Sequence, residues 1–425
     1  MPSTIWYISK YVTPPYAAKV GARGFLLLRE FARAGHCAVL ITSDSNHLAS
    51  PPKLTGPRLK EAIDGVDVHW LRTWKYRGAL SIGRMISWLD FEWQLWRMPK
   101  SDLPRPDVVI VSSLSLLTVL NGLWLRRKYG CKLVFEVRDI WPLTLVEVGR
   151  LSSWNPFVVF LGWIERLGYR RADMIVGTMP NLVEHVSKVT KSHRPVICVP
   201  QGIDPTLLLP PQVVPKDFVE QYIPREKFIV CYAGSIGTAN ALDTLLACAR
   251  ELNDRRDIHF IVVGEGDLKS RFQKESSDLG NVSFPPAVPK AAVADLLGRT
   301  DLLYFAFHKA SRLRFGQSLN KVIDYMLSGK PIVASYTGFP SMINEADCGS
   351  FVPAEDVSAL RAEIERYADM PAEARARIGE RGRDWIMKNR RFETVAADYL
   401  RNIGLESAAP ETSEGVAHQP STSAN

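Results

Sequence analysis

Short runs of hydrophobic residues alternate with longer segments of helical periodicity along most of the chain. In the first half, apolar runs rich in Val, Ile and Leu occupy residues 4–9, 36–43, 106–113, 131–137, 172–179 and 194–204. Segments such as 23–35 and 117–129 lie between them and carry apolar residues at spacings of three and four. Apolar strands separated by helices are typical of a parallel sheet that is covered on both faces.

The alternation begins again after a proline-rich stretch at 205–217. Strands are expected at 227–237, 257–266, 282–286, 301–307 and 331–335, with helices at 239–253, 267–278 and 289–298 and after Ser318. The chain is therefore predicted to be an α/β protein with two doubly wound parallel-sheet, Rossmann-like domains that face a central cleft. We expect domains at 1–204 and 218–385, a linker at 205–217, a C-terminal helix at 386–406 that returns to the first domain, and a disordered tail at 407–425.

The charge of the chain is unevenly distributed. The first 205 residues carry 27 Lys/Arg against 16 Asp/Glu, a net charge of +11, and the remaining residues carry 26 against 29, a net charge of −3. Ten of the 11 tryptophans also lie in the first half. Basic charge together with many aromatics favours contact with an anionic membrane surface or an acidic ligand. The alternative is a basic domain with an ordinary core.

Two apolar stretches in the first half are too short to span a bilayer. The charge-free one, at 151–164, has fourteen residues, whereas a spanning helix needs about 20. It could lie in the membrane interface with Trp154, Phe157, Phe160 and Trp163 toward the lipid. The stretch at 85–98 has the same character, and either one could equally be a core helix.

The cysteines and the N-terminus indicate the compartment. The six cysteines form no C-x-x-C pair, so neither a disulfide framework nor a zinc site is expected. The N-terminus, MPSTIWYISKYVTPP, lacks the features of a signal peptide. These features fit a reducing compartment, and we expect a cytoplasmic protein with no nucleic-acid partner.

The helix after Ser318 groups polar residues of complementary chemistry. Its apolar residues follow helical spacing, which leaves Asn320, Lys321 and Asp324 on the opposite side. Ser318 is expected to cap the helix, whose free N–H groups beside Lys321 favour a phosphate. Asp324 could accept hydrogen bonds from ribose hydroxyls. The alternative is a solvated Lys–Asp pair.

A glycine-bearing loop at 234–237 follows a predicted strand and directly precedes a predicted helix. Its glycines would let backbone N–H groups approach a diphosphate, or they could serve a tight packing turn. The similar join at 262–267 is expected to be structural. No D-x-D pair favours a metal bridge to the diphosphate, so its charge would need the two helix N-termini and Lys321, aided by Arg312 or Arg314.

In the first half, Glu136, Arg138 and Asp139 end an apolar strand, where open α/β sheets place ligand-binding groups. A charged trio at a buried strand end needs partners, and these are either a ligand or a structural ion pair. The glycine-rich loop that contains Gly21 and Arg23 is expected to face the same cleft.

These motifs together resemble a GT-B glycosyltransferase of the family-4 (group 1, retaining) type. The resemblance is strongest to the bacterial surface-polysaccharide subgroup that includes the L-fucosamine transferase of O-antigen synthesis. It covers about residues 5 to 400, and it is carried by GARGFLLLREFARAGH, PDVVIVSSLSLL, FEVRDIWP, YRRADMIV, VPQGID, YAGSIGTANALDTLL, VVGEGDL and FGQSLNKVIDYMLSGKPIVAS.

The resemblance implies a retaining transfer of a sugar, without a metal or another cofactor. The donor would be a nucleotide sugar, UDP-linked and carrying an N-acetylated amino sugar. The acceptor would be a polyprenyl-diphosphate-linked saccharide at the anionic inner membrane surface. The protein would then be peripheral on the inner face of the cytoplasmic membrane. It assigns the donor to Gly234, Ser235, Gly237, Val288, Ser318, Leu319, Asn320, Lys321 and Asp324. It assigns the acceptor side to Gly21, Arg23, Ser113, Arg138 and Asp139, and catalysis to Asp139, Glu136 and Lys321.

The sequence departs from the family pattern at three points. Gly316 stands where the family has the first of two glutamates, no cation follows the 234–237 loop, and Gln201 replaces the hinge asparagine. Two other functions are therefore considered. One is a sugar-nucleotide 2-epimerase of the same fold, and the other is an inactive, membrane-associated assembly protein.

Overall fold

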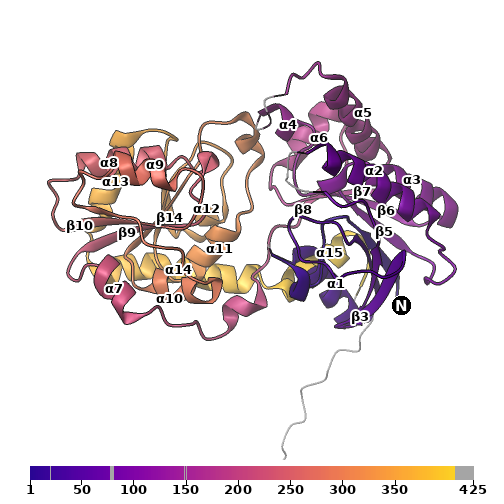
Figure 1. Ribbon diagram of the computed structural model, residues 1–425, viewed down its shortest axis with the longest axis horizontal. Coiled ribbons are helices and arrows are strands. Elements are labelled where there is room, and N and C mark those ends of the chain that lie inside the picture. Colours follow the sequence, from indigo (N-terminus) through magenta and orange to yellow (C-terminus); the bar gives the residue numbers. More distant parts are fainter. Residues whose placement is uncertain (20, 77–80, 148, 150, 407–425) are drawn as a thin grey trace, which may run out of the picture.

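The computed structural model describes residues 1–19, 21–76, 81–147, 149 and 151–406, which form two α/β units on separate sheets (Figure 1). The N-terminal sheet has eight strands in the order β3-β4-β2-β1-β5-β6-β7-β8. All neighbours are parallel except the pair β3 and β4. The strands are β1 Thr4–Ile8, β2 Cys37–Ser43, β3 Arg58–Ile63, β4 Val66–Leu71, β5 Val108–Ser112, β6 Lys132–Val137, β7 Met174–Gly177 and β8 Val196–Cys198.

The antiparallel hairpin of β3 and β4 was not predicted from the hydrophobic pattern. The last paired residues of the hairpin are Ile63 and Val66, so only Asp64 and Gly65 connect the two strands. Both have left-handed φ values, 49° and 80°. An Asp-Gly pair suits such a turn because both residues tolerate positive φ. The half-exposed β3 lacks a continuous apolar run, which is why the pattern missed it.

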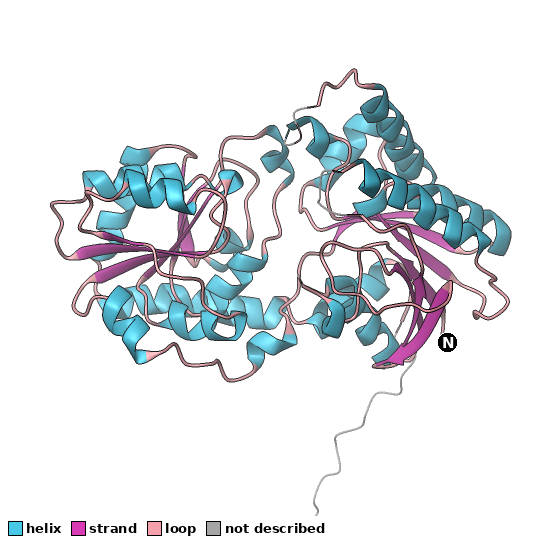
Figure 2. Cartoon of the chain, in the orientation of Figure 1, coloured by secondary structure: helices cyan, strands magenta, loops and turns pink. Residues whose placement is uncertain are grey.

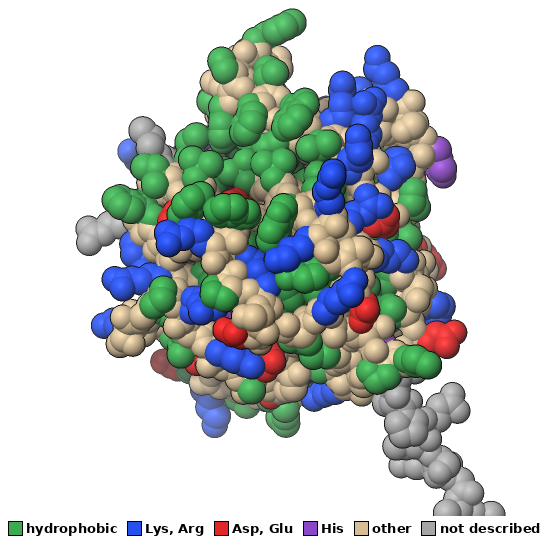
Figure 3. All heavy atoms as spheres, turned by 90° about the vertical axis from the view of Figure 1, so that its right-hand side faces the viewer, with side chains coloured by type: hydrophobic (Ala, Val, Ile, Leu, Met, Phe, Trp, Pro, Cys, Tyr) green, Lys and Arg blue, Asp and Glu red, His purple; other side chains and the backbone are tan. Residues whose placement is uncertain are grey.

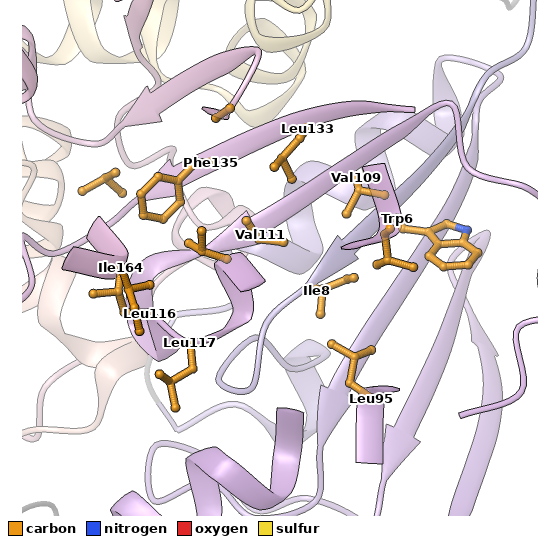
Figure 4. Packing of buried hydrophobic residues seen from close by; sticks show 14 of the residues in the cluster. Trp6, Ile8, Leu95, Val109, Val111, Leu116, Leu117, Leu133, Phe135 and Ile164 are labelled. Atoms are coloured by element: carbon orange, nitrogen blue, oxygen red, sulfur yellow. The ribbon is translucent and has the colours of Figure 1, made fainter. Parts of the chain in front are cut away.

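Alternate residues of the N-terminal strands enter two separate cores. Trp6, Ile8, Val109 and Val111 face one set of helices, whereas Ile5, Tyr7, Val108 and Ile110 face the other, as the period of two requires. Figure 4 shows the first core, where strand residues meet Leu95 and Ile164 from helices and Leu116 and Leu117 from the turn before Thr118. The helices of this unit are α1 Arg23–Arg33, α2 Ile82–Arg97, α3 Thr118–Tyr129, α4 Leu143–Glu147, α5 Pro156–Arg171 and α6 Leu182–Thr190.

The C-terminal sheet has six parallel strands in the order β11-β10-β9-β12-β13-β14. Its last strand, at the sheet edge, was not predicted. The strands are β9 Phe228–Ala233, β10 Ile258–Val263, β11 Val282–Ser283, β12 Leu302–Ala306, β13 Ile332–Ser335 and β14 Gly349–Val352. Helices cover both faces (Figure 2): α7 Lys216–Tyr222, α8 Leu242–Glu251, α9 Lys269–Glu275, α10 Val293–Gly298, α11 Asn320–Leu327, α12 Met342–Ala346, α13 Val357–Ala368 and α14 Ala372–Asn389.

The end of the chain passes from the second unit back to the first. Residue 385, where the sequence placed the end of the second domain, lies inside α14. The next helix, α15 Phe392–Asn402, packs against α1, with the rings of Phe31 and Tyr399 5.4 Å apart. The predicted disorder of 407–425 lies outside the described residues.

The strand orders place two crevices at carboxyl ends of strands. In the N-terminal sheet the order reverses between β1 and β5, and in the C-terminal sheet it reverses between β9 and β12. Loops that leave such a pair of strands diverge to opposite faces and open a crevice between them. The predicted two-domain parallel architecture is thereby confirmed, with β3 as the antiparallel exception. Among the described residues, no helix is both long and apolar enough to cross a membrane.

Candidate active site

The loop at 234–237 leaves β9 and lies along the loop that leaves β10. Gly234 N donates to Val263 O at 3.0 Å, and Ile236 N donates to Glu265 O at 2.9 Å. A Cβ at Gly264 would lie 1.8 Å from Gly234 O, and one at Gly266 would lie 2.2 Å from Ile236 O. The two glycines of 262–267 are therefore required for close backbone packing, in keeping with the structural role expected for this join.

The 234–237 loop, at the carboxyl end of β9, has peptide N–H groups that are unpaired in the part of the chain that the structure describes. Within the described residues, the N–H groups of Ser235 and Gly237 have no hydrogen-bond partner. The carbonyl of Ser235 is held by Tyr232 Oη at 2.6 Å and Asn240 Nδ2 at 2.9 Å. Unpaired N–H groups on a fixed loop can bind an anion.

The helix after this loop begins later than predicted. A 3₁₀ turn at Thr238–Asn240 and Ala241, with a left-handed φ of 42°, separate Gly237 from Leu242, the first residue of α8. The N-terminus of α8 therefore does not adjoin the glycine loop directly. A diphosphate at this loop would therefore meet the loop itself and the side chains beside it, not the helix start that the sequence predicted.

Lys321, in the first turn of α11, brings a cation to this loop. Its Nζ donates to Asn240 Oδ1 at 2.8 Å and to Tyr232 Oη at 3.0 Å, and it lies 4.5 Å from the centre of the Tyr232 ring. A Cβ on Gly234 would be 3.1 Å from the same Nζ. Burial lowers the pKa of Lys321 to about 8. The ammonium group has only neutral partners here, so a diphosphate beside it would supply the missing negative charge.

The start of α11 lies at the boundary between the two units. Leu319 is the N-cap residue, with no side-chain capping bond, so the predicted cap by Ser318 is wrong. Ser318 Oγ instead accepts from Gln201 N at 2.8 Å. Asn320 is exposed, and a Cβ built on Gly21 would be 3.7 Å from Asn320 Nδ2. The structure thus brings the Gly21 loop of the first unit next to α11 of the second.

Asp324, one turn further along α11, is almost covered. Its Oδ2 accepts from Lys290 Nζ at 2.5 Å, while its buried Oδ1 has no partner among the described residues. Burial raises the pKa of Asp324, and Lys290 partly offsets this. Val288, two residues before Lys290, is half-buried against the C-terminal core that also contains the apolar residues of α11. An unsatisfied buried carboxylate oxygen is a place where ligand hydroxyls could bind.

Gly316, which stands in place of the family glutamate, is held against the first unit. Its φ is left-handed at 88°, and a Cβ there would be 2.5 Å from Pro180 Cγ. The preceding Phe315 is fully buried in the N-terminal core, 5.2 Å from the His185 ring. In this arrangement position 316 has no room for any side chain, so a glutamate could not replace it without movement.

The residues before Phe315 bind the first unit as well. Arg312 lies 3.8 Å from Glu147, and Arg314 lies 3.4 Å from Glu184. Ser311 also contacts Glu147. Both arginines thus pair with carboxylates of the N-terminal unit, and their help to a diphosphate stays a prediction that would require them to leave these partners.

Glu136 and Arg23 form a buried pair away from the cleft surface. Glu136 is fully buried, and Arg23 is 2% exposed. Arg23 Nη1 donates to Glu136 Oε1 at 2.5 Å, and Tyr7 Oη donates to the same oxygen at 3.0 Å. Arg23 Nη2 also donates to Val199 O at 2.7 Å. The pair joins β1, β6, α1 and the end of the unit, and Glu136 Oε2 has no partner among the described residues. The catalytic role of Glu136 and the acceptor role of Arg23 stay predictions.

Asp139, at the turn after β6, has the geometry of a fixed carboxylate. Thr144 Oγ1 donates to its Oδ1 at 2.7 Å, and Trp141 Nε1 donates to its Oδ2 at 3.2 Å. Ser113 Oγ accepts from Arg138 N at 3.1 Å and donates to Asp139 O at 3.0 Å. Ser113 therefore shapes the turn that carries Asp139, and both oxygens of the half-buried carboxylate retain lone pairs for a hydroxyl.

Arg138 adds a guanidinium beside this turn. Its side chain has neither a hydrogen bond nor an ion pair within the part of the chain that the structure describes. Its pKa is lowered by burial, and neighbouring Arg23 acts in the same direction. A half-buried cation of this kind would be stabilised by an anionic ligand.

Several residues of the site were not predicted, namely Tyr232, Asn240, Trp141, Thr144 and Lys290. Asn240 lies six residues after Gly234, and its amide oxygen accepts from Lys321 Nζ. Tyr232 ends a buried strand and resembled a core residue. Among the described residues, no group of three or more His, Cys, Asp or Glu is arranged to hold a metal ion.

Two protein families match the two halves of the chain. Residues 22–202 match the family described as glycosyl transferase 4-like domain, and residues 227–369 match glycosyl transferases group 1. No curated protein sequence matches the chain. The two halves are therefore glycosyltransferase domains, and the chain is a glycosyltransferase of the GT-B type.

Solved structures share this fold along nearly their whole length. Sucrose-phosphate synthase from Thermosynechococcus elongatus superposes with a TM-score of 0.65 at 16% identity, covering 94% of this chain and 98% of its own. HepE from Anabaena in complex with UDP superposes with a TM-score of 0.62 at 13% sequence identity, and the match covers 94% of this chain and 99% of HepE. A trehalose-6-phosphate protein from E. coli bound with UDP-2-fluoro glucose superposes with a TM-score of 0.69 at 12% sequence identity. The match covers 94% of this chain and 99% of the E. coli chain. At these identities the likeness establishes the fold.

Proposed function

We propose that the chain transfers a sugar from a UDP-linked donor to a polyprenyl-diphosphate-linked saccharide, with retention of anomeric configuration. The observation that carries the proposal is the position of the Lys321 ammonium, held by neutral partners beside the unpaired N–H groups of Ser235 and Gly237. Structural neighbours with this fold bind UDP, UDP-glucose and a fluorinated UDP-glucose, which supports a uridine diphosphate at the equivalent loop.

The donor would be oriented by two fixed groups along α11. The diphosphate binds the N–H groups of the 234–237 loop and Lys321, and the ribose hydroxyls bind Asp324 once Lys290 moves aside. Negative charge grows on the diphosphate as the bond to the anomeric carbon breaks. Fixed donors aimed at that charge lower the barrier because they need no reorganisation during the reaction.

The acceptor hydroxyl would approach from the N-terminal unit. Its oxygen bonds to the anomeric carbon on the face from which the diphosphate departs, so the configuration is retained. Asp139, fixed by Thr144 and Trp141, orients this hydroxyl. The hydroxyl proton passes to the leaving diphosphate oxygen or to Asp139, so that glycoside and UDP are the products.

The identities of the transferred sugar and of the acceptor are proposed from the family resemblance of the sequence and from the charge of the first half of the chain. The surface-polysaccharide subgroup suggests an N-acetylated amino sugar as the transferred group. The basic, tryptophan-rich first half suits a lipid-linked acceptor at the anionic inner face of the cytoplasmic membrane.

A panel of UDP- and GDP-sugars, incubated with purified polyprenyl-diphosphate saccharides, tests the proposal. We expect UDP release and a product whose anomeric proton coupling matches that of the donor. Lys321→Met should lower turnover at least about a hundredfold, the scale of one lost charge-stabilising group, with an unchanged melting temperature.

Other results would point to the alternatives. Interconversion of a sugar nucleotide without acceptor would indicate an epimerase, and a chain that binds no UDP by calorimetry would be an assembly protein. Inversion at the anomeric carbon would refute the retaining mechanism while leaving the donor site intact.

A further inference from the structure

Large hydrophobic side chains are exposed on one side of the N-terminal unit. We define the tryptophan face as Leu89, Trp93, Trp96, Trp154, Phe160 and Trp163. Their side chains are 46% to 87% exposed, with Trp154 the most exposed of the six. Figure 3 shows hydrophobic side chains gathered over the upper part of this side, with Lys and Arg side chains around them. A contiguous apolar patch on a soluble surface indicates a binding site.

The tryptophan face is distinct from the core-facing side of the same helices. On α2, Trp88, Phe91 and Leu95 are 6%, 0% and 1% exposed and enter the N-terminal core. Leu89, Trp93 and Trp96 follow one another at i, i+4 and i+7 on the outer side. A helix that covers a soluble domain has polar residues there, so the second apolar side of α2 lacks its partner.

The helix α5 repeats this arrangement. Val158, Leu161 and Ile164 are buried, whereas Phe160 and Trp163 are exposed. Phe157, which the sequence placed toward lipid, is half-buried against the core instead. Because α3 packs against both α2 and α5, the three helices form one layer, and the exposed residues belong to one side of the molecule (Figure 1).

Cations surround this face. Arg97 lies 5.8 Å from the Trp93 ring at the end of α2, and exposed Arg166, Arg170 and Arg171 follow Trp163 on α5. Tryptophans with arginines at their margin suit the bilayer interface, where rings enter the headgroup region and cations bind anionic lipid. A protein partner would need an acidic rim to match these charges.

From this geometry we infer that the tryptophan face docks the enzyme on an anionic lipid bilayer. The inference rests on the proposed function, for which the acceptor is membrane-borne, and it assigns the surface and orientation. Docking would place the acceptor side of the cleft close to the bilayer. Trp88, on the inner side of α2, is 5.4 Å from Trp141, whose Nε1 binds Asp139. One helix, about 10–12 Å thick, thus separates the membrane from that cluster.

The test compares Leu89→Glu with Leu209→Glu, because the two leucines are 62% and 63% exposed and only Leu89 lies on the face. Full-length protein is sedimented with vesicles of phosphatidylcholine alone and with vesicles in which about a third of the lipid is phosphatidylglycerol. We expect wild type and Leu209→Glu to prefer the anionic vesicles, and Leu89→Glu to lose at least about tenfold in partitioning, since each face residue buries apolar area. Equal melting temperatures and UDP affinities establish that the variants are folded.

Equal binding of Leu89→Glu and wild type to anionic vesicles would overturn the inference. A concentration-dependent dimer that Leu89→Glu abolishes, without vesicle binding by wild type, would overturn it too and assign the face to a second copy. Transfer to a water-soluble acceptor is measured in parallel. If wild type transfers no sugar to the water-soluble acceptor, the proposed function is contradicted. The vesicle experiment still tests the tryptophan face independently of that result.

Discussion

Lys321 is a cation that depends on its surroundings to stay charged. Its neutral partners Tyr232 and Asn240 hold the Nζ without compensating its charge, and burial lowers its pKa to about 8. The ammonium is therefore present in the free enzyme below pH 8 and lost as the pH rises above it. A bound diphosphate favours the charged form and raises the pKa again, so binding takes up a proton at alkaline pH.

UDP affinity should accordingly fall as the pH rises beyond about 8, by up to about tenfold per pH unit. Isothermal titration between neutral and alkaline pH measures this fall. Lys321→Met is the control, because it retains any titration of UDP itself and should bind more weakly with a flatter profile. The assignment fails if the two profiles run parallel.

At the level of residues, the polar side of α11 was predictable because helical spacing separates it from the core. Which charged residues at a strand end are accessible to a ligand was not predictable. Glu136 and Asp139 are three positions apart in one motif, yet one lies in the core and the other at its margin, since β6 ends between them. Chain position alone cannot show on which side of a strand end a carboxylate lies.

The segment Ser311–Phe315, which we call the clasp, has anchors in both units two residues apart. Leu313 is fully buried in the C-terminal core, and its carbonyl accepts from Tyr336 Oη at 3.1 Å. Phe315 is fully buried in the N-terminal core, and its carbonyl accepts from Asn181 N at 2.9 Å. The clasp therefore opposes separation of the two units, and it leads directly into α11.

Phe315→Ala should open the cleft. Removing a buried phenylalanine costs about 3–5 kcal/mol, and here the loss falls on the contact between the units. We expect a larger radius of gyration by small-angle X-ray scattering. Leu313→Ala removes a comparable side chain from the other core, and it should lower the melting temperature with the radius unchanged. An unchanged radius in Phe315→Ala would show that the clasp does not hold the units together.

The elements themselves were largely predictable where the apolar runs are continuous. The hairpin β3–β4 was missed although Asp64-Gly65 is a turn signal, because β3 is half-exposed and polar. The start of α8 was misplaced because Ala241, in a left-handed conformation, interrupts a sequence with good helix-forming residues. The clasp had no signal at all, since the partners of Phe315 are more than a hundred residues away.

At the scale of the whole molecule, the N-terminal unit is incomplete without the end of the chain. Phe392, Val395, Tyr399 and Leu400 of α15 are almost fully buried in the core that also contains α1. The first 204 residues therefore leave an apolar surface uncovered.

A chain that ends at Arg390 should lose the stability of its first unit while the second remains folded. Burial of four large side chains corresponds to roughly 6–12 kcal/mol, comparable with the whole stability of a domain. Differential scanning calorimetry should show the transition of the first unit weakened or absent. A synthetic α15 peptide added in trans should restore it, and two unaltered transitions would contradict this account.

The two passages of the chain between the units lie side by side, since Ile203 N donates to Arg390 O at 2.7 Å. In Figure 1 the passage from α14 to α15 runs along the lower side of the molecule, while α4, whose last residue Glu147 meets the clasp, is near the top. The two units are thus joined at two separate places, the paired passages of the chain and the clasp. If substrates enter and UDP leaves by a rotation of one unit about the paired passages, the rate at which Phe315 leaves its site sets a ceiling on turnover, however fast the chemistry is.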